Sequence, residues 1–179
     1  MTMSSVIRPA TSADAAAIAA IYAHYVANTT ISFEEQVPTE AEMAQRLAAT
    51  TSQGLPWLVL EEDGRLLGYA YGGVWKGRSA YRHTVEASVY LDPAAGGRGL
   101  GSRLYQALFD LLREQGMHTV IASIALPNPA SVALHERFGF APVGRFSEVG
   151  RKFGQWHDVG YWQLLLSPEA ATGTQGETP

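Results

Sequence analysis

The sequence predicts a single α+β domain, and three observations lead to that fold class. The chain has 179 residues, of which 46% are hydrophobic and 17% charged, so it can bury one sizeable core. Apolar residues recur with helical spacing in some segments and alternate as in strands in others. No internal repeat or linker interrupts this pattern. We expect one domain over residues 1–166 and a disordered tail over residues 167–179.

The first half of the chain predicts a strand, two helices and a β-hairpin. Thr11 or Ser12 can cap the first helix. Thr39 and Glu42 form the capping box that opens the second helix. A Glu-Asp-Gly-Arg turn then separates two apolar runs. The expected segments are a strand at 6–8, a helix to about residue 26, a loop at 28–37, a helix from residue 39, and strands at 57–61 and 66–74.

The second half alternates strands and helices. Residues 84–91 have strand periodicity, which places Glu86 on the face turned away from the apolar residues. The helix that follows is stopped by Gly116 and has a stripe of leucines, namely Leu100, Leu104, Leu108 and Leu111. Asn128 caps the next helix, with Pro129 at its first position. The expected segments are strand 84–91, helix 99–115, strand 119–125, a helix ended by Gly139, and strands 142–149 and 156–166.

Composition excludes several classes of function. The chain has 13 basic and 17 acidic residues and a net charge of −4, which argues against a surface for nucleic acid. No apolar run approaches the roughly 18 residues of a membrane helix, and no secretory signal is visible before Ile7. The chain contains no cysteine, and its histidines lack metal-ligand spacing. We expect a cytoplasmic protein without a metal, a membrane or a nucleic-acid partner.

The densest chemical signal lies where a predicted strand runs into a helix. Of the six residues from Gly96 to Gly101, four are glycine. Glycine lets an anion approach the backbone, and the first-turn amides of a helix lack intrahelical acceptors. Together with the helix dipole these amides form a phosphate site, to which Arg98 and Arg103 would add positive charge. The alternative is a glycine-rich turn without a ligand.

Two common nucleotide-binding loops do not fit this segment. A Walker loop ends in Gly-Lys-Ser or Gly-Lys-Thr, whereas Gly101 is followed by Ser102 and Arg103. A dinucleotide fingerprint requires glycine at Ser102, and an acidic residue about twenty positions further on. A phosphate ligand of this loop therefore belongs to another class.

The glycine loop resembles motif A of the GNAT family of acetyl-CoA-dependent N-acetyltransferases, Gln/Arg-x-x-Gly-x-Gly/Ala, aligned on Gly96 to Gly101. The chain departs from the motif at Gly96, where the family has Gln or Arg, so that a side-chain contact to the diphosphate is lost. A second GNAT signature follows over residues 128–140, with His135 where many members have tyrosine. The resemblance covers Val6 to Leu166. It implies the GNAT fold, an α+β three-layer arrangement in which about four helices flank a mixed and mostly antiparallel central sheet.

Further segments are similar to the phosphinothricin and methionine sulfoximine acetyltransferase branch of that family. They are residues 84–90, 134–136 and 154–163, and residues 29–33 stand where the branch has its substrate loop. The resemblance implies acetyl transfer from acetyl-CoA to the α-amine of a small amino-acid analogue such as phosphinothricin or methionine sulfoximine or sulfone. It also implies a homodimer. The alternatives are a GNAT enzyme acting on another amine (an amino acid, a polyamine or a protein N-terminus) and a catalytically silent acyl-CoA-binding module.

Two residues are candidates for proton transfer. An α-ammonium group must lose a proton before it attacks a thioester, and a positioned base contributes about 10²–10⁴ in rate. Glu86 is the candidate for this base, because residues 84–86 match the family. His135 shares a helix face with Asn128 and Ser131 and is the candidate for the acid, or for a hydrogen bond to the thiol. His135 is also the alternative base, and the sequence does not separate the two assignments.

Further residues are expected to contact the ligands. The resemblance implies that an amide near Tyr90 or Leu91 would polarise the thioester carbonyl. The anionic groups of the substrate favour a guanidinium, for which Arg82 is preferred and Lys76 comes second. The predicted cofactor-binding residues are Val89, Tyr90, Leu91, Gly96, Gly97, Arg98, Gly99, Leu100, Gly101, Ser102, Asn128 and Ser131. The predicted substrate-binding residues are Phe33, Lys76, Arg82 and Glu86.

Overall fold

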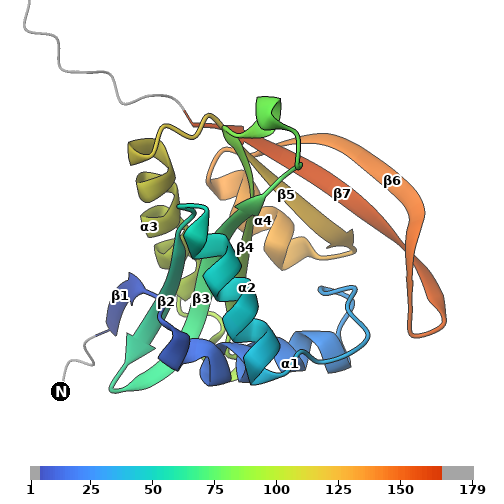
Figure 1. The fold of residues 1–179 in the computed structure, drawn as a ribbon. Coiled ribbons are helices and arrows are strands. Elements are labelled where there is room, and N and C mark those ends of the chain that lie inside the picture. The colour runs from blue at the N-terminus through green and yellow to red at the C-terminus, as the bar shows by residue number, and fades with distance from the viewer. Residues whose placement is uncertain (1–4, 167–179) are drawn as a thin grey trace, which may run out of the picture.

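A computed structural model describes residues 5–166, which form one seven-stranded sheet with helices on both faces (Figure 1). The strand order is β1-β2-β3-β4-β5-β7-β6. Within the described residues β4 and β5 pair in parallel and every other pair is antiparallel, which confirms the predicted mixed and mostly antiparallel sheet. The strands are β1 Ser5–Pro9, β2 Trp57–Glu62, β3 Arg65–Val74, β4 Thr84–Leu91, β5 Thr119–Leu126, β6 Ala141–Lys152 and β7 Gln155–Leu165.

Local signals mark the start of α2 and α4 and the end of α3, whereas the predicted cap Thr11 precedes a short 3₁₀ turn, Ser12–Asp14, and α1 begins after it. The α-helices of the described part are α1 Ala15–Asn28, α2 Glu40–Ser52, α3 Leu100–Glu114 and α4 Pro129–Arg137. Thr39 and Glu42 form the capping box of α2. The Asn128 side chain caps α4 by accepting from the Ser131 amide at 3.1 Å. Gly116 follows α3 in the left-handed region, with φ of 75°.

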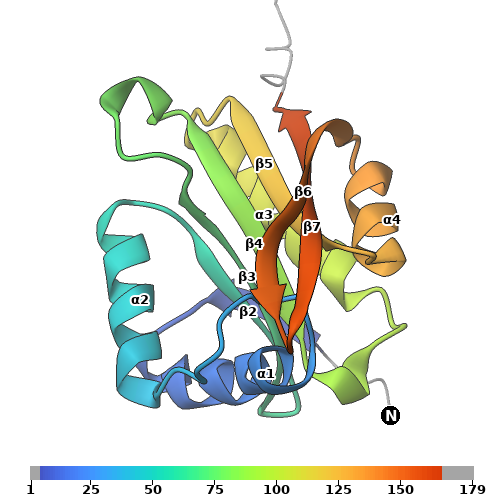
Figure 2. The same ribbon diagram turned by 90° about the vertical axis from the view of Figure 1, so that its right-hand side faces the viewer.

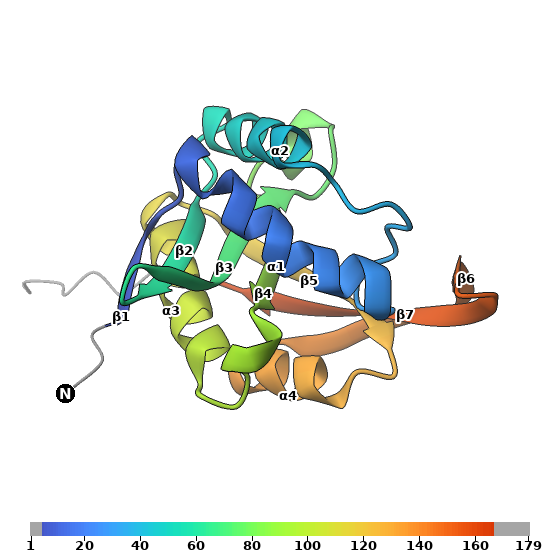
Figure 3. The same ribbon diagram turned by 90° about the horizontal axis from the view of Figure 1, so that it is seen from below.

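The helices form two outer layers around the sheet. Figure 3 shows α1 and α2 on one face of the sheet and α3 and α4 on the other. The larger core packs α3 against the strands and fully buries Leu104, Leu108, Phe109 and Leu112. The second core packs α1 and α2 on β2 and β3. Since Val85 and Ala87 of β4 belong to the α3 core, the intervening residue Glu86 faces the other layer.

One irregularity of the sheet creates space for a ligand. β4 and β5 pair only over Thr84–Glu86 and Thr119–Ile121, whereas β5 pairs with β7 along its whole length. Beyond Glu86 the two parallel strands therefore separate toward their carboxyl ends. The last residue pair before the split is Glu86 with Ile121. Over residues 87–91 and 122–126 the two strands therefore do not pair with each other.

Two details of the predicted elements were wrong. The strand expected at 142–149 continues to Lys152, because a bulge between Phe146 and Gly150 absorbs extra residues without ending the pairing. The Asp158 carboxylate holds this bulge by accepting from the Glu148 amide at 2.7 Å. In α3, the predicted Leu111 is half-buried and packs against the core, and the fully buried Leu112 is the leucine that the prediction left out. The predicted tail, residues 167–179, lies outside the described residues.

Candidate active site

A groove follows the split between β4 and β5. One stretch of it reaches the glycine loop, and a second stretch passes between the strands toward the face that carries Glu86. Both stretches are lined by Ile31, Val89, Asn128 and Ser131. The loop stretch adds Tyr25, Leu91, Asp92, Pro93, Gly96, Gly101, Ala130 and Leu134. The inner stretch adds Ala87, Ser88, Tyr90, Tyr105, Ser123, Ile124, Ala125 and His135.

The glycine loop has the backbone of an anion-binding turn. Gly97 and Gly99 adopt φ of 76° and 72°, a left-handed conformation that costs a side chain about 1–2 kcal/mol. Gly99 is the N-cap of α3 and contributes no side-chain cap, so the first-turn amides are left for a ligand. At Gly101 a Cβ atom would lie 3.6 Å from Leu134 and 3.8 Å from Leu91, so glycine keeps the groove open there.

The arginines beside the loop have protein partners. Arg98 donates to the Glu62 carboxylate at 2.7 Å, and this pairing lowers the pKa of Glu62. Arg103 donates to the Ser5 hydroxyl at 2.5 Å. Leu100 is buried in the α3 core and Ser102 is half-buried. The positive end of the site therefore consists of peptide amides, and the predicted contact of Arg98 with a phosphate stays a prediction.

His135 is held on both sides of its ring. Its Nδ1 lies 2.7 Å from the Ser131 carbonyl oxygen, which can only accept, so Nδ1 carries the proton. Its Nε2 lies 3.0 Å from the Tyr105 hydroxyl and therefore accepts from it. Burial lowers the pKa of His135 and raises that of Tyr105, so both groups are neutral near pH 7. The pair forms a fixed hydrogen-bonded unit on the α3 and α4 side of the groove.

Glu86 lies at the apex of the split, on the opposite face from His135. Its cross-strand neighbours are Gly73 of β3 and Ile121 of β5. The residue is half-buried, and within residues 5–166 its carboxylate has no ion-pair partner. Gly73 itself places no side chain beside Glu86, and a Cβ atom there would lie 3.7 Å from the ring of Tyr71. A carboxylate in this position can accept a proton from a group that enters the split.

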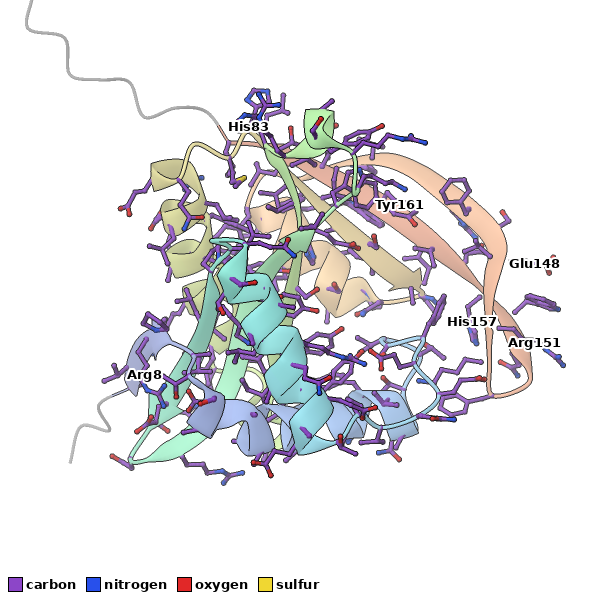
Figure 4. The ribbon with its side chains drawn as sticks, viewed as in Figure 1. Arg8, His83, Glu148, Arg151, His157 and Tyr161 are labelled. Atoms are coloured by element: carbon purple, nitrogen blue, oxygen red, sulfur yellow. The ribbon has the colours of Figure 1, made fainter. Side chains whose placement is uncertain are left out.

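The loop between α1 and α2 closes this face of the groove together with the β6–β7 hairpin. Figure 2 shows the loop passing beneath the tip of the hairpin. Phe33 of the loop is half-buried, and its ring centroid lies 6.1 Å from that of His157 in β7. Figure 4 shows His157 and Tyr161 on β7, and Glu148 and Arg151 on the outer side of the hairpin. Phe33 thus packs against the hairpin near the end of the chain, and its predicted contact with the substrate stays a prediction.

The cations predicted for the substrate lie in the segment that precedes β4. Lys76 and Arg82 line a cavity of about 460 Å³ at the amino end of the strand, together with Arg78 and Tyr81. Arg82 precedes Glu86 by four residues, and its guanidinium donates to the Ser79 carbonyl at 3.2 Å. The groove along the split does not include either residue. Their contact with an anionic substrate group stays a prediction.

Sequence reasoning did not name several side chains that line the groove, among them Tyr25, Tyr105 and Ser123. Tyr105 follows Leu104 in an apolar stripe and has the signature of a core residue, which hides its hydroxyl contact with His135. Ile31 lies in a loop without periodicity, and only the resemblance over residues 29–33 pointed to that loop. In residues 5–166, no cluster of three or more His, Asp or Glu could hold a metal ion, and no helix is long and apolar enough to cross a membrane.

The chain is similar to known acetyltransferases over most of its length. Residues 7–160 match the family described as "Acetyltransferase (GNAT) domain". The chain is 44% identical over 157 residues to a phosphinothricin N-acetyltransferase of Streptomyces viridochromogenes, covering 88% of this chain and 85% of that one. It is 44% identical over 170 residues to an L-methionine sulfoximine/L-methionine sulfone acetyltransferase of Pseudomonas paraeruginosa, covering 93% and 97%. A phosphinothricin acetyltransferase of the GNAT superfamily from Sinorhizobium meliloti, solved in complex with acetyl-CoA, superposes with a TM-score of 0.89 at 38% identity and covers 99% of this chain and 97% of its own.

Proposed function

Because this chain belongs to the GNAT acetyltransferase family and is an acetyl-CoA-dependent N-acetyltransferase with the GNAT fold, we propose that its acceptor is the α-amine of a small amino-acid analogue. Phosphinothricin and methionine sulfoximine or sulfone are the proposed examples, since similar proteins carry those activities in their names. The observation that carries the proposal is the place of Glu86, which ends the paired part of β4 and β5 on the sheet face that α1 and α2 cover, directly before the groove-lining residues Ala87 and Ser88.

Acetyl-CoA is assigned to the groove along the split. The amides of Gly97 to Gly101 would hold its diphosphate, because the left-handed glycines and the uncapped start of α3 turn them toward a ligand. The pantetheine arm would follow Val89, Tyr90, Leu91, Asn128 and Ser131, which line the groove or adjoin it. The other predicted contacts, from Gly96, Arg98, Leu100 and Ser102, belong to the same proposal. Bound acetyl-CoA supplies an acyl thioester, whose carbonyl carbon forms the new bond to the amine nitrogen while its C–S bond breaks.

Glu86 is the base in this proposal. Its carboxylate takes the proton that the ammonium group loses, and the sulfur leaves as a thiolate. An amide near Tyr90 donates to the thioester oxygen. His135 is unsuited to the role of base, because its Nε2 already accepts from Tyr105 and its Nδ1 donates to Ser131. The single proton of the Tyr105 hydroxyl is donated to His135, so in this proposal the thiolate takes its proton from solvent.

The acceptor side of the site is assigned to the loop and the hairpin. Phe33 would pack against the carbon chain of the substrate, and Arg82 or Lys76 would meet an anionic group that extends along β4. A small substrate fits this arrangement better than a peptide, since the loop covers the face on which Glu86 lies (Figure 2). The second candidate function, acetylation of another amine, uses the same Glu86 and the same groove.

A thiol-release assay tests the acceptor class. Purified protein is mixed with acetyl-CoA and either methionine sulfoximine or phosphinothricin, and free coenzyme A is followed with a thiol reagent. We expect turnover with at least one of the two, above a control without amine. Turnover of a polyamine or of a peptide with a free N-terminus, with neither amino-acid analogue used, would replace this acceptor class with another one.

We include a homodimer and a cytoplasmic location in the proposal. β6 is an edge strand of the sheet, and it carries Val143, Phe146 and Val149 at exposures of 56%, 58% and 54%. Trp156 at the start of β7 is 59% exposed. An edge with exposed apolar side chains favours pairing with a second copy. Sedimentation of the wild type against Phe146→Ser tests it, with a shift toward the monomer expected.

A further inference from the structure

A buried lysine of the hairpin holds the loop between α1 and α2. Lys152, the last residue of β6, is 2% exposed. Its Nζ donates to the carbonyl oxygens of Val26 at 2.7 Å and of Ser32 at 2.6 Å. Within the described residues no carboxylate lies within ion-pair distance of this ammonium. Burying an ammonium costs free energy unless hydrogen bonds offset it, so these two carbonyls, with the Phe153 ring 5.0 Å from Nζ, stabilise the buried Lys152.

A second contact joins the same two segments. The ring of Phe33 lies directly on Gly150 of β6, where a Cβ atom would be 2.1 Å from the ring carbon Cε2. Only glycine at this position lets the ring take its place in the wall. The hairpin and the loop therefore meet at two points. Lys152 donates to the backbone of the loop, and Gly150 packs against the side chain of Phe33.

The loop is also tied to the helices at its base. The Tyr22 hydroxyl of α1 contacts the Ser32 hydroxyl at 2.7 Å and donates to Glu34 at 2.9 Å. Arg46 of α2 donates to both oxygens of Glu34, at 2.6 and 2.9 Å. Ser32 thus uses its side chain toward the helices and its carbonyl toward Lys152. Between these anchors, Ile31 is presented to the groove.

We propose that Lys152 is a positioning residue for the amine substrate: it fixes the 29–36 loop against the hairpin, so that Ile31 and Phe33 form a wall of fixed shape opposite Glu86. The inference rests on the proposed function for its effect on catalysis. The contacts of Lys152 with Val26 and Ser32, here called the clasp, are a property of the free protein. Lys152 touches no reacting atom in this assignment. Without it, the loop has to be ordered by the substrate at each binding event.

The catalytic test uses Lys152→Met, which keeps the length of the side chain and removes its hydrogen bonds. Losing hydrogen bonds from a charged donor should raise the KM for methionine sulfoximine by about tenfold, with kcat and the Kd for acetyl-CoA within about twofold of the wild type. Arg151→Met is the matched control, because Arg151 is the exposed neighbour on the same strand and points away from the loop (Figure 4). An unchanged KM in Lys152→Met would overturn the proposed effect on the substrate.

Hydrogen–deuterium exchange of the free protein tests the clasp without any substrate. Peptides that cover residues 27–39 should exchange at least about tenfold faster in Lys152→Met, while those that cover α3 keep the wild-type rate. Gly150→Ala, which displaces Phe33 by a different route, should accelerate the same peptides. Exchange that stays at the wild-type rate in both variants, or that rises equally in α3, would overturn the clasp. If no amine is acetylated but the loop loosens as stated, the proposed acceptor is wrong and the clasp stands.

Discussion

The two walls of the groove are built in opposite ways. The acetyl-CoA side consists of continuous stretches, residues 91–101 and 128–135, in which a strand or a cap runs directly into a helix. The acceptor side joins segments far apart in the chain, such as Lys152 with Val26 and Ser32, at sequence separations of 126 and 120 residues. One wall is therefore encoded by local turn and capping chemistry, and the other by tertiary contacts.

This difference separates the two tasks of the enzyme. The cofactor side binds the same acetyl-CoA in every turnover, and backbone amides at a helix start suffice for that task. The acceptor side has to fit one kind of amine, and its shape depends on a loop and a hairpin, of which only Ile31 also lines the stretch beside the glycine loop. Variants on the two sides should accordingly affect different constants, and the following changes test that separation.

The largest effect is expected on the acceptor face, for Glu86→Gln. Removing the base should lower kcat by about 10²–10³, because the amine then has to lose its proton to water. The Kd for acetyl-CoA by calorimetry should stay within about twofold, since Glu86 does not belong to the groove that the cofactor occupies. Glu114→Gln, at the exposed end of α3, is the control. Full activity of Glu86→Gln from pH 6 to 9 would move the base to another residue.

A smaller effect is expected on the cofactor side, for Gly99→Val. A branched residue in the left-handed region costs about 1–2 kcal/mol, and a loop that relaxes to avoid this cost should bind acetyl-CoA about tenfold more weakly. Gly116→Val is the matched control, because Gly116 has nearly the same φ, 75° against 72°, at the other end of the same helix. Both positions have no atom within 4 Å of the added Cβ, so their strain is comparable. Equal losses of affinity in the two variants would show that strain alone, and not the loop, is responsible.

The smallest effect concerns the buried pair, and it is an effect on stability. Because burial lowers the pKa of His135, the folded state disfavours its protonated form, and the unfolded chain takes up the proton first. The free energy of unfolding should therefore fall as the pH drops below about 6.5, by at most ~1.4 kcal/mol per pH unit for one proton. In denaturant titrations from pH 7 to 5, the free energy of unfolding of His135→Asn should depend less on pH than that of the wild type. The exposed His118→Asn should keep the pH dependence of the wild type. The same slope in all three proteins would contradict a neutral, buried His135.

The sequence predicted the features that depend on neighbouring residues, and it did not predict those that depend on distant segments. The capping box at Thr39, the cap at Asn128 and the glycine at position 116 act through neighbours in the chain, so their patterns located the helices. The bulge near Gly150 depends on Asp158 from the neighbouring strand, and the strand was therefore expected to end too early. The buried Lys152 has no local signal either, since a charged residue in a strand is usually exposed. Contacts between segments that are far apart in the chain, such as those of Lys152, have no such signal in the sequence.

The most direct test is a crystal structure of this protein with acetyl-CoA bound. We predict diphosphate oxygens about 3 Å from backbone amides between Gly97 and Gly101, and a thioester that enters the split between β4 and β5 from the α3 side and ends beside Glu86. A diphosphate held elsewhere, or a thioester that ends away from the split, would contradict the assignment of the two walls.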